Sequence, residues 1–299
     1  DSISIDQMAR AVSAPRIPLR AAPDRWGAVR QHVFWGAVYH GLLLAGARAY
    51  PGYRPHRHPT PTGEFWLYLR HLLSLPKRRW QRRIATWRVR HGKFPYHVAL
   101  LQLAHDANFR GYGDFSDQAA FLDHVCSAFA RGAPCHHHLV LKAHPLEDGR
   151  EPLRPLVRCL SKTHDLEGRV HLITGGKLAR LLDGAESAVT VNSTSAEQAL
   201  WRGLPLKVLG RAVFNRPEFA SEQPLPDFFA RPAHPDHEAY LAYRRYLLQT
   251  SQISGGYYAA EARRMALRRL PDLMLASQDP YDLFENLDAS TRQHMRIVA

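Results

Sequence analysis

Cysteine is scarce in this chain of 299 residues, which has three, and no two of them form a CxxC pair. Such a sparse, odd set argues against a disulfide framework and fits the reducing cytoplasm. Long apolar runs are also scarce: the most apolar stretch, residues 33–47, is interrupted by His40 and is too short to span a bilayer. The chain starts with neither a methionine nor a secretory leader, so we expect a processed or truncated product that is soluble or peripheral.

Glycine-rich phosphate loops are missing as well. Neither GxGxxG nor GxxxxGK[ST] occurs, so neither a standard dinucleotide fold nor a P-loop is indicated. The only metal-like run is Cys135-His-His-His138. Consecutive residues entering a strand point to opposite faces, so these four are not expected to form one tetrahedral site, and we expect no metal.

The composition is that of a packed globular protein, with 45% hydrophobic and 22% charged residues. Lysine and arginine number 40 against 27 aspartate and glutamate, a net charge of +13 with 18 histidines in reserve. Such an excess attracts anions, and nucleic acid, anionic lipid and phosphorylated or carboxylated substrates all qualify. The charge alone does not choose among them.

Three parts are expected along the chain. Residues 1–92 are predicted to form a helical and linker segment, residues 93–250 a Rossmann-like domain, and residues 251–299 C-terminal helices. The pattern changes at residue 93, where short runs rich in β-formers begin to alternate with helical stretches.

The first part itself is predicted to be mostly helical. Residues 1–25 have no clear period and predict an arm, whereas apolar residues at helical spacing predict a helix over residues 24–50. Residues 54–62 contain three prolines and predict a loop, followed by a second helix over residues 63–75.

A strongly basic helix is predicted over residues 77–91, which hold seven lysines and arginines in fifteen positions. Trp80, Ile84 and Trp87 share one face of it. Three interpretations are open: a solvated helix whose tryptophan face packs on the domain, a basic face on an anionic lipid surface, or a nucleic-acid contact. The candidate membrane-facing residues are Lys77, Arg78, Arg79, Arg82 and Arg83.

Five strands separated by four helices predict a parallel α/β sheet with right-handed crossovers. The strands are expected at residues 96–103, 139–143, 170–174, 188–192 and 206–209. The helices are expected at residues 116–131, 152–164, 177–184 and 195–202, with two more at 235–250 and 259–276. In such a sheet ligands bind beyond the carboxyl ends of the strands, so the residues just after each strand are the informative ones.

Polar side chains follow the first two predicted strands. Gln102 lies at the end of the first and Asp106 comes after it, where Asp106 either caps the next turn or acts as a nucleophile or base. Lys142, His144 and Pro145 end the second. A cation and an imidazole there could hold a phosphate and protonate a leaving oxygen, although a histidine at a strand end is often structural.

Asn192 ends the fourth predicted strand, Ser193 and Thr194 follow it, and Thr194 with Glu197 has the spacing of a capping box. The free N–H groups of a helix that starts there could bind a phosphate, or the motif could simply cap the helix. Lys207 lies in the fifth predicted strand.

These motifs, in this order, resemble the bacterial capsule polysaccharide biosynthesis family, of the KpsS and KpsC type of β-Kdo transferases. They are Gln102-x-x-x-Asp106, Lys142-x-His144-Pro145, Asn192-Ser-Thr194 and Lys207-Val-Leu-Gly210. The resemblance covers residues 93–260 well and the preceding basic helix more loosely. It implies a GT-B fold and a retaining, metal-independent transfer of β-Kdo from CMP-β-Kdo to a lipid or a growing Kdo linker, with no cofactor.

The resemblance also implies roles for single residues. Lys142, His144, Ser193 and Thr194 would contact the phosphate and ribose of CMP, with Glu197 near the ribose. Asp106 would be the catalytic carboxylate, a candidate nucleophile in a double displacement, with His144 as its catalytic partner. The remaining donor-binding candidates are Gln102, Pro145, Asn192 and Lys207.

Two departures from the family's pattern stand out. The region before residue 93 looks helical, so we expect the family's N-terminal Rossmann domain to be absent or incomplete here. Ala107 also follows the aspartate where relatives often carry a small polar residue.

The resemblance implies several partners: the nucleotide sugar, a lipid or glycolipid acceptor, the anionic inner-membrane surface from its cytoplasmic side, and a capsule export complex. Two rival functions remain. One is a transferase for another CMP-sugar, of the sialyl type, and the other is a non-catalytic scaffold for capsule assembly or export. No RNA- or DNA-binding motif accompanies the basic helix, so no nucleic-acid partner is expected.

Overall fold

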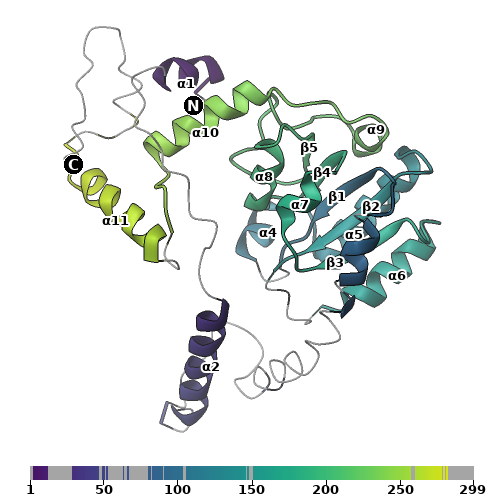
Figure 1. Ribbon diagram of the computed structural model, residues 1–299, viewed down its shortest axis with the longest axis horizontal. Coiled ribbons are helices and arrows are strands. Elements are labelled where there is room, and N and C mark those ends of the chain that lie inside the picture. Colours follow the sequence, from purple (N-terminus) through teal and green to yellow (C-terminus); the bar gives the residue numbers. More distant parts are fainter. Residues whose placement is uncertain are drawn as a thin grey trace. The chain divides into compact units, whose positions relative to one another are not determined.

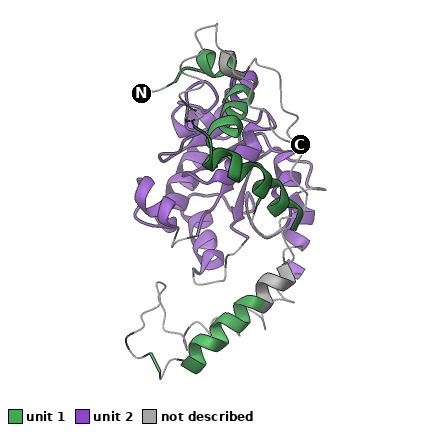
Figure 2. Ribbon diagram, turned by 90° about the vertical axis from the view of Figure 1, so that its left-hand side faces the viewer, with its two compact units in different colours: residues 1–62, 241–299 green, residues 63–240 purple. Residues whose placement is uncertain are grey.

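The computed structural model (Figure 1) forms two compact units, one of residues 1–62 with 241–299 and one of residues 63–240, which Figure 2 shows in different colours. The divisions expected at residues 92/93 and 250/251 stay predictions. The structure describes residues 3–12, 29–46, 49–50, 52, 63, 66, 80–81, 83–89, 91–103, 106–145, 147, 151–256, 260–277, 279 and 281.

A five-stranded parallel sheet forms the centre of the unit at residues 63–240. Its strands are β1 (Tyr96–Leu100), β2 (His138–Ala143), β3 (Val170–Thr174), β4 (Ser187–Thr190) and β5 (Leu206–Val208). They lie in the order β3-β2-β1-β4-β5, and all four pairings are parallel (Figure 1). The predicted Rossmann-like parallel sheet is therefore confirmed, and its strands start or end within three residues of the predicted bounds.

Helices connect the strands in the alternation that the sequence predicts. They are α4 (Ala107–Tyr112), α5 (Gln118–Gly132), α6 (Leu153–Thr163), α7 (Leu178–Leu182), the 3-10 turn η1 (Thr194–Ala196), α8 (Glu197–Leu200) and α9 (Leu225–Ala230). The helices α5 and α6, which lead to β2 and β3, contact each other, and so do α7 and α8, which lead to β4 and β5. Right-handed crossovers place these two groups on opposite faces of the sheet, because the strand order reverses between β1 and β4.

The core lies between the sheet and α5. Phe121, Leu122 and Phe129 of α5 are almost fully buried and pack in one cluster with Leu139 and Leu141 of β2. Each such side chain contributes about 1.5–3 kcal/mol by leaving water. Asp117 caps α5 by accepting a hydrogen bond from the Ala120 N–H at 2.8 Å, which fixes where the helix begins.

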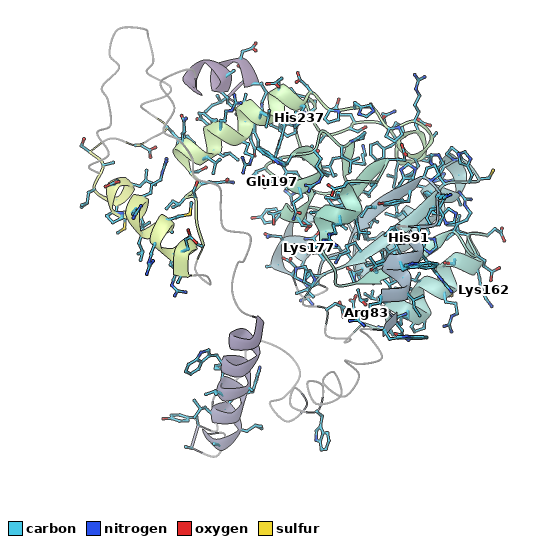
Figure 3. All side chains as sticks on the ribbon, viewed as in Figure 1. Arg83, His91, Lys162, Lys177, Glu197 and His237 are labelled. Carbon is cyan, nitrogen blue, oxygen red and sulfur yellow. The ribbon has the colours of Figure 1, made fainter. Side chains whose placement is uncertain are left out.

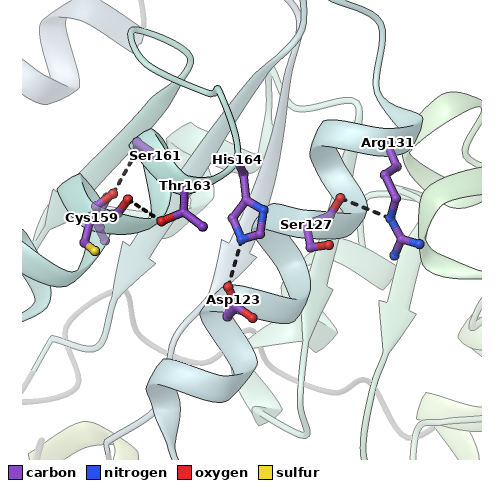
Figure 4. A network of polar contacts seen from close by, with 8 residues as sticks. Asp123, Ser127, Arg131, Cys159, Ser161, Thr163 and His164 are labelled. Atoms are coloured by element: carbon purple, nitrogen blue, oxygen red, sulfur yellow. Dashed lines mark hydrogen bonds and ion pairs between the residues drawn. The ribbon is translucent and has the colours of Figure 1, made fainter.

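A polar contact joins α6 to α5, and further polar contacts lie within each of these helices. The His164 ring Nε2 lies 2.8 Å from the Asp123 carboxylate, and so the end of α6 is tied to the middle of α5 (Figure 4). Thr163 donates back to the Cys159 carbonyl, and Arg131 donates to the Ser127 carbonyl, each one turn earlier in its own helix. These contacts are exposed to solvent and therefore contribute little to stability.

The helix α10 (His237–Thr250) passes from one unit to the other. At its start, the His237 ring lies 3.2 Å from the Leu200 carbonyl at the end of α8, and Tyr240 donates to the Glu197 carbonyl (Figure 3). The unit at residues 1–62 with 241–299 holds the rest of α10 together with α1 (Ile5–Val12), α2 (Val29–Gly46) and α11 (Ala260–Met274).

The helix α1 corrects the expectation of an arm for residues 5–12, and residues 13–25 lie outside the described residues. Ser4 and Gln7 form a reciprocal capping box, in which each side chain accepts a hydrogen bond from the other residue's N–H. Met8 is buried one turn later. This S-x-x-Q pattern was present in the sequence as a helix-start signal. The helix predicted over residues 63–75 lies almost wholly outside the described residues.

No helix among the described residues combines the length and the apolar character needed to cross a membrane. The helix α2 is the longest of them, and Trp35, Tyr39 and Leu42 are exposed along it.

Candidate functional site

Gln102 and Asn192 meet where the strand order reverses, at the carboxyl ends of β1 and β4. Gln102 donates from Nε2 to Asn192 Oδ1 at 2.8 Å, and Gln102 Oε1 accepts from the Asn192 backbone N–H at 3.2 Å. Both residues are buried. Their amide groups therefore tie β1 and β4 together at the position where parallel sheets take their ligands. Direct contact of either amide with a donor stays a prediction.

Asp106 begins α4 and caps it, since its Oδ1 accepts a hydrogen bond from the Asn108 N–H at 2.9 Å. The carbonyl of the same Asn108 accepts from Asn192 Nδ2 at 2.8 Å. Asn108 thus links the candidate catalytic carboxylate to the motif after β4. The capping interpretation of Asp106 is observed, and it leaves Asp106 partly exposed at the edge of the sheet.

Lys142, His144 and Pro145 lie at the end of β2. Lys142 is buried, with 4% of its surface exposed, and its ammonium donates to the Ala143 carbonyl at 2.8 Å. It pairs in register with Leu100, the last residue of β1, and its charge is held at the end of β2. His144 is partly buried directly after the strand, and Pro145 is exposed.

The segment after β4 turns into a helix where expected, but the predicted capping box is wrong. Ser193, one residue before the predicted Thr194, takes the cap position of η1 and makes no side-chain cap bond. Its hydroxyl instead lies 2.8 Å from that of Ser195, and its N–H donates to Thr190 Oγ1. The reason is the tighter 3-10 turn, whose first backbone bond already runs from the Ala196 N–H to the Ser193 carbonyl.

Thr194 is exposed and Glu197 is partly buried on the same short helical segment. Lys207, in the middle of β5, is tied elsewhere: its ammonium donates to the Ser221 carbonyl at 3.0 Å. Burial lowers the pKa of Lys207 below its ordinary value, and Glu222 partly opposes that effect.

Two glycines close the edge of the site, and the sequence interpretation gave neither of them a structural role. Gly113 and Gly210 form an isolated antiparallel bridge between the segments after α4 and β5. A Cβ on Gly113 would lie 2.9 Å from Val191 Cγ1 and 2.5 Å from the Phe109 carbonyl oxygen. A Cβ on Gly210 would also lie 2.9 Å from Val191 Cγ1. Only glycine lets these two backbones approach so closely.

A cluster of histidines, which the sequence interpretation also missed, lies at the opposite end of the sheet, near the amino ends of β1, β2 and β3. We call His97, His137, His138 and His171 the histidine ladder. His97 of β1 is completely buried, with its Nδ1 2.7 Å from Ser187 Oγ and its Nε2 2.9 Å from His137 Nδ1. Burial, with a smaller contribution from His137, lowers the pKa of His97 to about 3. His97 is therefore a neutral structural residue that bridges β1, β4 and the entrance to β2.

His138 and His171 form a second pair at this end, with His138 Nδ1 2.8 Å from His171 Nε2. Phe94 stacks on His138 at 3.7 Å between ring centroids. Burial, followed by His138 and Arg88, lowers the pKa of His171 to about 4. The consecutive His137 and His138 thus contact different partners, as their alternation predicts, and no group of three or more metal-ligating side chains gathers in the described residues.

Of the five candidate membrane-facing residues, Lys77, Arg78, Arg79 and Arg82 lie outside the described residues. Arg83 is exposed on a helix that the structure describes at residues 80–81, 83–89 and 91 (Figure 3). Trp80 and Trp87 are 66% and 62% exposed, so the interpretation in which the tryptophan face packs on the domain does not hold for them.

The order of the strands and the polar groups beyond their carboxyl ends define a Rossmann-like domain, a class that takes its ligands where the strand order reverses. The family model for "Capsule polysaccharide biosynthesis protein" matches residues 34–258. The chain belongs to this family.

Two curated relatives show how much of a longer protein this chain matches. Capsule polysaccharide modification protein LipB of Neisseria meningitidis serogroup A is 33% identical over 226 residues, which cover 74% of this chain and 53% of LipB. Capsule polysaccharide export protein KpsS of Escherichia coli is 32% identical over 163 residues, which cover 54% of this chain and 42% of KpsS. The chain therefore spans about half the length of the curated relatives it matches.

One solved structure with some similarity is the beta Kdo 2,7 transferase KpsC of Thermosulfurimonas dismutans. It is 17% identical, with a TM-score of 0.38, and the match covers 69% of this chain and 67% of KpsC.

Proposed function

We propose that this member of the capsule polysaccharide biosynthesis family is the donor-binding part of a glycosyltransferase of GT-B type, which moves β-Kdo from CMP-β-Kdo to a lipid or Kdo-linker acceptor. One observation carries the proposal: Asn108 binds Asp106 through its N–H and Asn192 through its carbonyl. The carboxylate and the Asn192-Ser-Thr194 motif, 86 positions later in the chain, are thereby joined at the edge where such sheets bind ligands.

The donor would lie over this edge with its phosphate toward Lys142, His144, Ser193 and Thr194. The Lys142 ammonium is buried at the end of β2, and a charge in such a low-dielectric place acts more strongly on a phosphate than one in water. Glu197 would face the ribose. Gln102, Asn192, Pro145 and Lys207 would shape the pocket, the first two through the bonds they make to each other and Lys207 through its bond to Ser221.

The proposed chemistry retains configuration, because a β-linked donor gives a β-linked product. Asp106 attacks the anomeric carbon, the bond from that carbon to the phosphate oxygen breaks, and CMP leaves with the electron pair while His144 and Lys142 neutralise its charge. The acceptor hydroxyl then attacks the same carbon, releases the Asp106 carboxylate and gives up its proton to solvent. The proposal requires no metal and no cofactor.

The acceptor class follows from the resemblance that the sequence already carries: a lipid or glycolipid at the cytoplasmic face of the inner membrane, alongside a capsule export complex. The net charge of +13 supports this placement, since such a protein is drawn to anionic surfaces.

Calorimetric titration of the purified chain with CMP, and with UMP and GMP as controls, tests the donor site. We expect selective binding of CMP that is lost in His144→Ala and kept in His124→Ala, a matched exposed histidine on α5. Competition of CMP by CMP-β-Kdo but not by CMP-sialic acid would then identify the sugar. If no nucleotide binds, the donor assignment is wrong and the chain is better described as a scaffold.

A further inference from the structure

Trp80 and Trp87 lie on one exposed face of the helix described at residues 80–81, 83–89 and 91. At about 100° per residue, Trp80, Trp87 and His91 point within about 20° of one direction. Trp80 and Trp87 are 66% and 62% exposed, and the His91 ring stacks on that of Trp87 at 5.3 Å. Together these side chains form an aromatic stripe open to solvent, which two isolated surface tryptophans would not do.

Arginines flank this stripe on both sides. By the same geometry Arg83 lies about 60° to one side of Trp80 and Arg88 about 80° to the other, and both are exposed. The surface formed by Trp80, Arg83, Trp87, Arg88 and His91 is called the aromatic-arginine face below.

The helix is held by its opposite side. Val89 lies about 180° from Trp80 and is 3% exposed, so the helix is packed on the side away from the aromatic-arginine face. The chain then enters β1, the central strand of the sheet, at Tyr96. The orientation of the exposed face is therefore fixed relative to the helix's own buried side.

The surrounding sequence has one sign of charge. Between Glu64 and Asp106 it contains nine lysines and arginines and no acidic residue. A partner for this region must be anionic and must also accept two large indole rings. The head-group region of an anionic bilayer fulfils both conditions, because indoles bury their apolar rings there and keep the N–H wet, while basic side chains pair with lipid phosphates.

We propose that the aromatic-arginine face is the docking surface of this protein for an anionic lipid bilayer, with Trp80 and Trp87 inserted at the head-group level. The inference deepens the proposed function, on which it rests for the lipid acceptor, because it names the residues that bring the donor site to the membrane. The tryptophans supply contact with the apolar boundary, and the arginines supply the preference for anionic lipid.

Sedimentation of the chain with vesicles of phosphatidylglycerol mixed with phosphatidylcholine tests the proposal, with pure phosphatidylcholine vesicles as reference. We expect binding to the anionic vesicles alone, weakened more than about tenfold in the variant with Trp80→Ala and Trp87→Ala. Trp201→Ala is the matched control, since Trp201 is 49% exposed at the end of α8, and it keeps wild-type binding. Arg83→Gln and Arg88→Gln each weaken binding about fivefold, and less at high salt.

Insertion has its own spectroscopic measurement. Brominated lipids quench a tryptophan that enters the bilayer, so quenching in the wild-type chain should fall in Trp80→Phe with Trp87→Phe and stay in Trp201→Phe. Unchanged vesicle binding by the double alanine variant overturns the proposal, as does equal binding to uncharged vesicles or displacement from vesicles by single-stranded polynucleotide. CMP titration of the same variants separates the two proposals, because loss of the docking surface leaves CMP affinity intact.

Discussion

Gln102 and Asn192 hold each other through two hydrogen bonds, although they lie 90 positions apart in the chain. The pair links the carboxyl end of β1 to that of β4. In Gln102→Leu the Asn192 N–H and its side-chain oxygen lose their partner in a buried place, which costs about 1–3 kcal/mol of unfolding free energy. Urea unfolding measures this loss. Gln198→Leu, an exposed glutamine on α8, is the control, and an equal midpoint for the two variants would contradict the role of the pair.

Asp106 caps α4 and is also the proposed nucleophile, and different substitutions separate these two roles. Asparagine is as good a helix cap as aspartate, so Asp106→Asn should keep the stability of the chain, whereas Asp106→Ala should lose about 0.5–2 kcal/mol. Both variants lack the nucleophile, and both should lose transfer of β-Kdo while they keep CMP binding. Thermal unfolding and a product assay measured side by side decide the matter. Wild-type turnover in Asp106→Asn would show that the carboxylate is only a cap.

The histidine ladder predicts a fold that weakens in acid. The pKa of His97 is about 3 and that of His171 about 4, both lowered first by burial, whereas an unfolded histidine titrates near about 6.5. Below that pH the two histidines bind protons in the unfolded chain but stay neutral in the folded chain. The contribution of these histidines to the unfolding free energy is therefore greatest above about pH 6.5. It falls by up to about 1.4 kcal/mol per pH unit for each histidine as the pH drops toward 4 for His171 and toward 3 for His97.

Urea unfolding at a series of pH values between 7.5 and 4.5 measures this dependence. We expect a shallower slope in His97→Gln, which stays uncharged over the whole range, although its stability at neutral pH also falls because the bonds to Ser187 and His137 change. His234→Gln, an exposed histidine, should keep the wild-type slope. A slope that is the same in all three proteins would rule out His97 as a source of the acid sensitivity.

The bridge between Gly113 and Gly210 predicts that a larger residue at Gly210 clashes with its neighbours, and that a second substitution relieves part of the clash. Gly210→Ala would place a Cβ 2.9 Å from Val191 Cγ1 and 2.8 Å from the Tyr112 carbonyl oxygen, and such overpacking costs about 1–3 kcal/mol. Adding Val191→Ala removes the side-chain half of the clash. The double variant should therefore lose less stability than the sum of the two single ones.

Gly111→Ala is the matched control, because nothing lies within 4 Å of its added Cβ and the residue is in the helix α4. It should be neutral or stabilise by up to about 1 kcal/mol. Thermal unfolding of the four variants tests the set, and an additive double variant would show that Val191 does not transmit the strain.

The sheet was predictable from sequence because its strands are short apolar runs, such as residues 139–143, between polar helices that repeat at regular intervals. The order β3-β2-β1-β4-β5 was not predictable in this way, because the residues of β1 do not specify which strands pair with it. The proximity of Gln102 and Asn192, and of His97 and Ser187, depends on that order. Contacts across strands therefore stayed hidden even where both partners had been noticed.

Helix starts illustrate a second limit. Ser4 and Gln7 have the capping-box spacing and form it, whereas Thr194 and Glu197 have the same spacing and do not. The difference lies in the backbone before the helix, because the chain leaves β4 through a 3-10 turn that uses Ser193 as its cap. Spacing indicates a helix start, but the geometry of the preceding strand decides which side chain reaches the free N–H groups.

The pairing of β1 with β4 also affects how the chain must be made. Residues 97–100 bond to residues 187–190, so about 90 residues are synthesised after β1 before its second edge is covered. At about 5–20 residues per second this takes several seconds or more, during which an apolar strand edge is bare. A chain that ends before residue 187 therefore leaves one edge of β1 unpaired, and β4 is the segment that covers this edge.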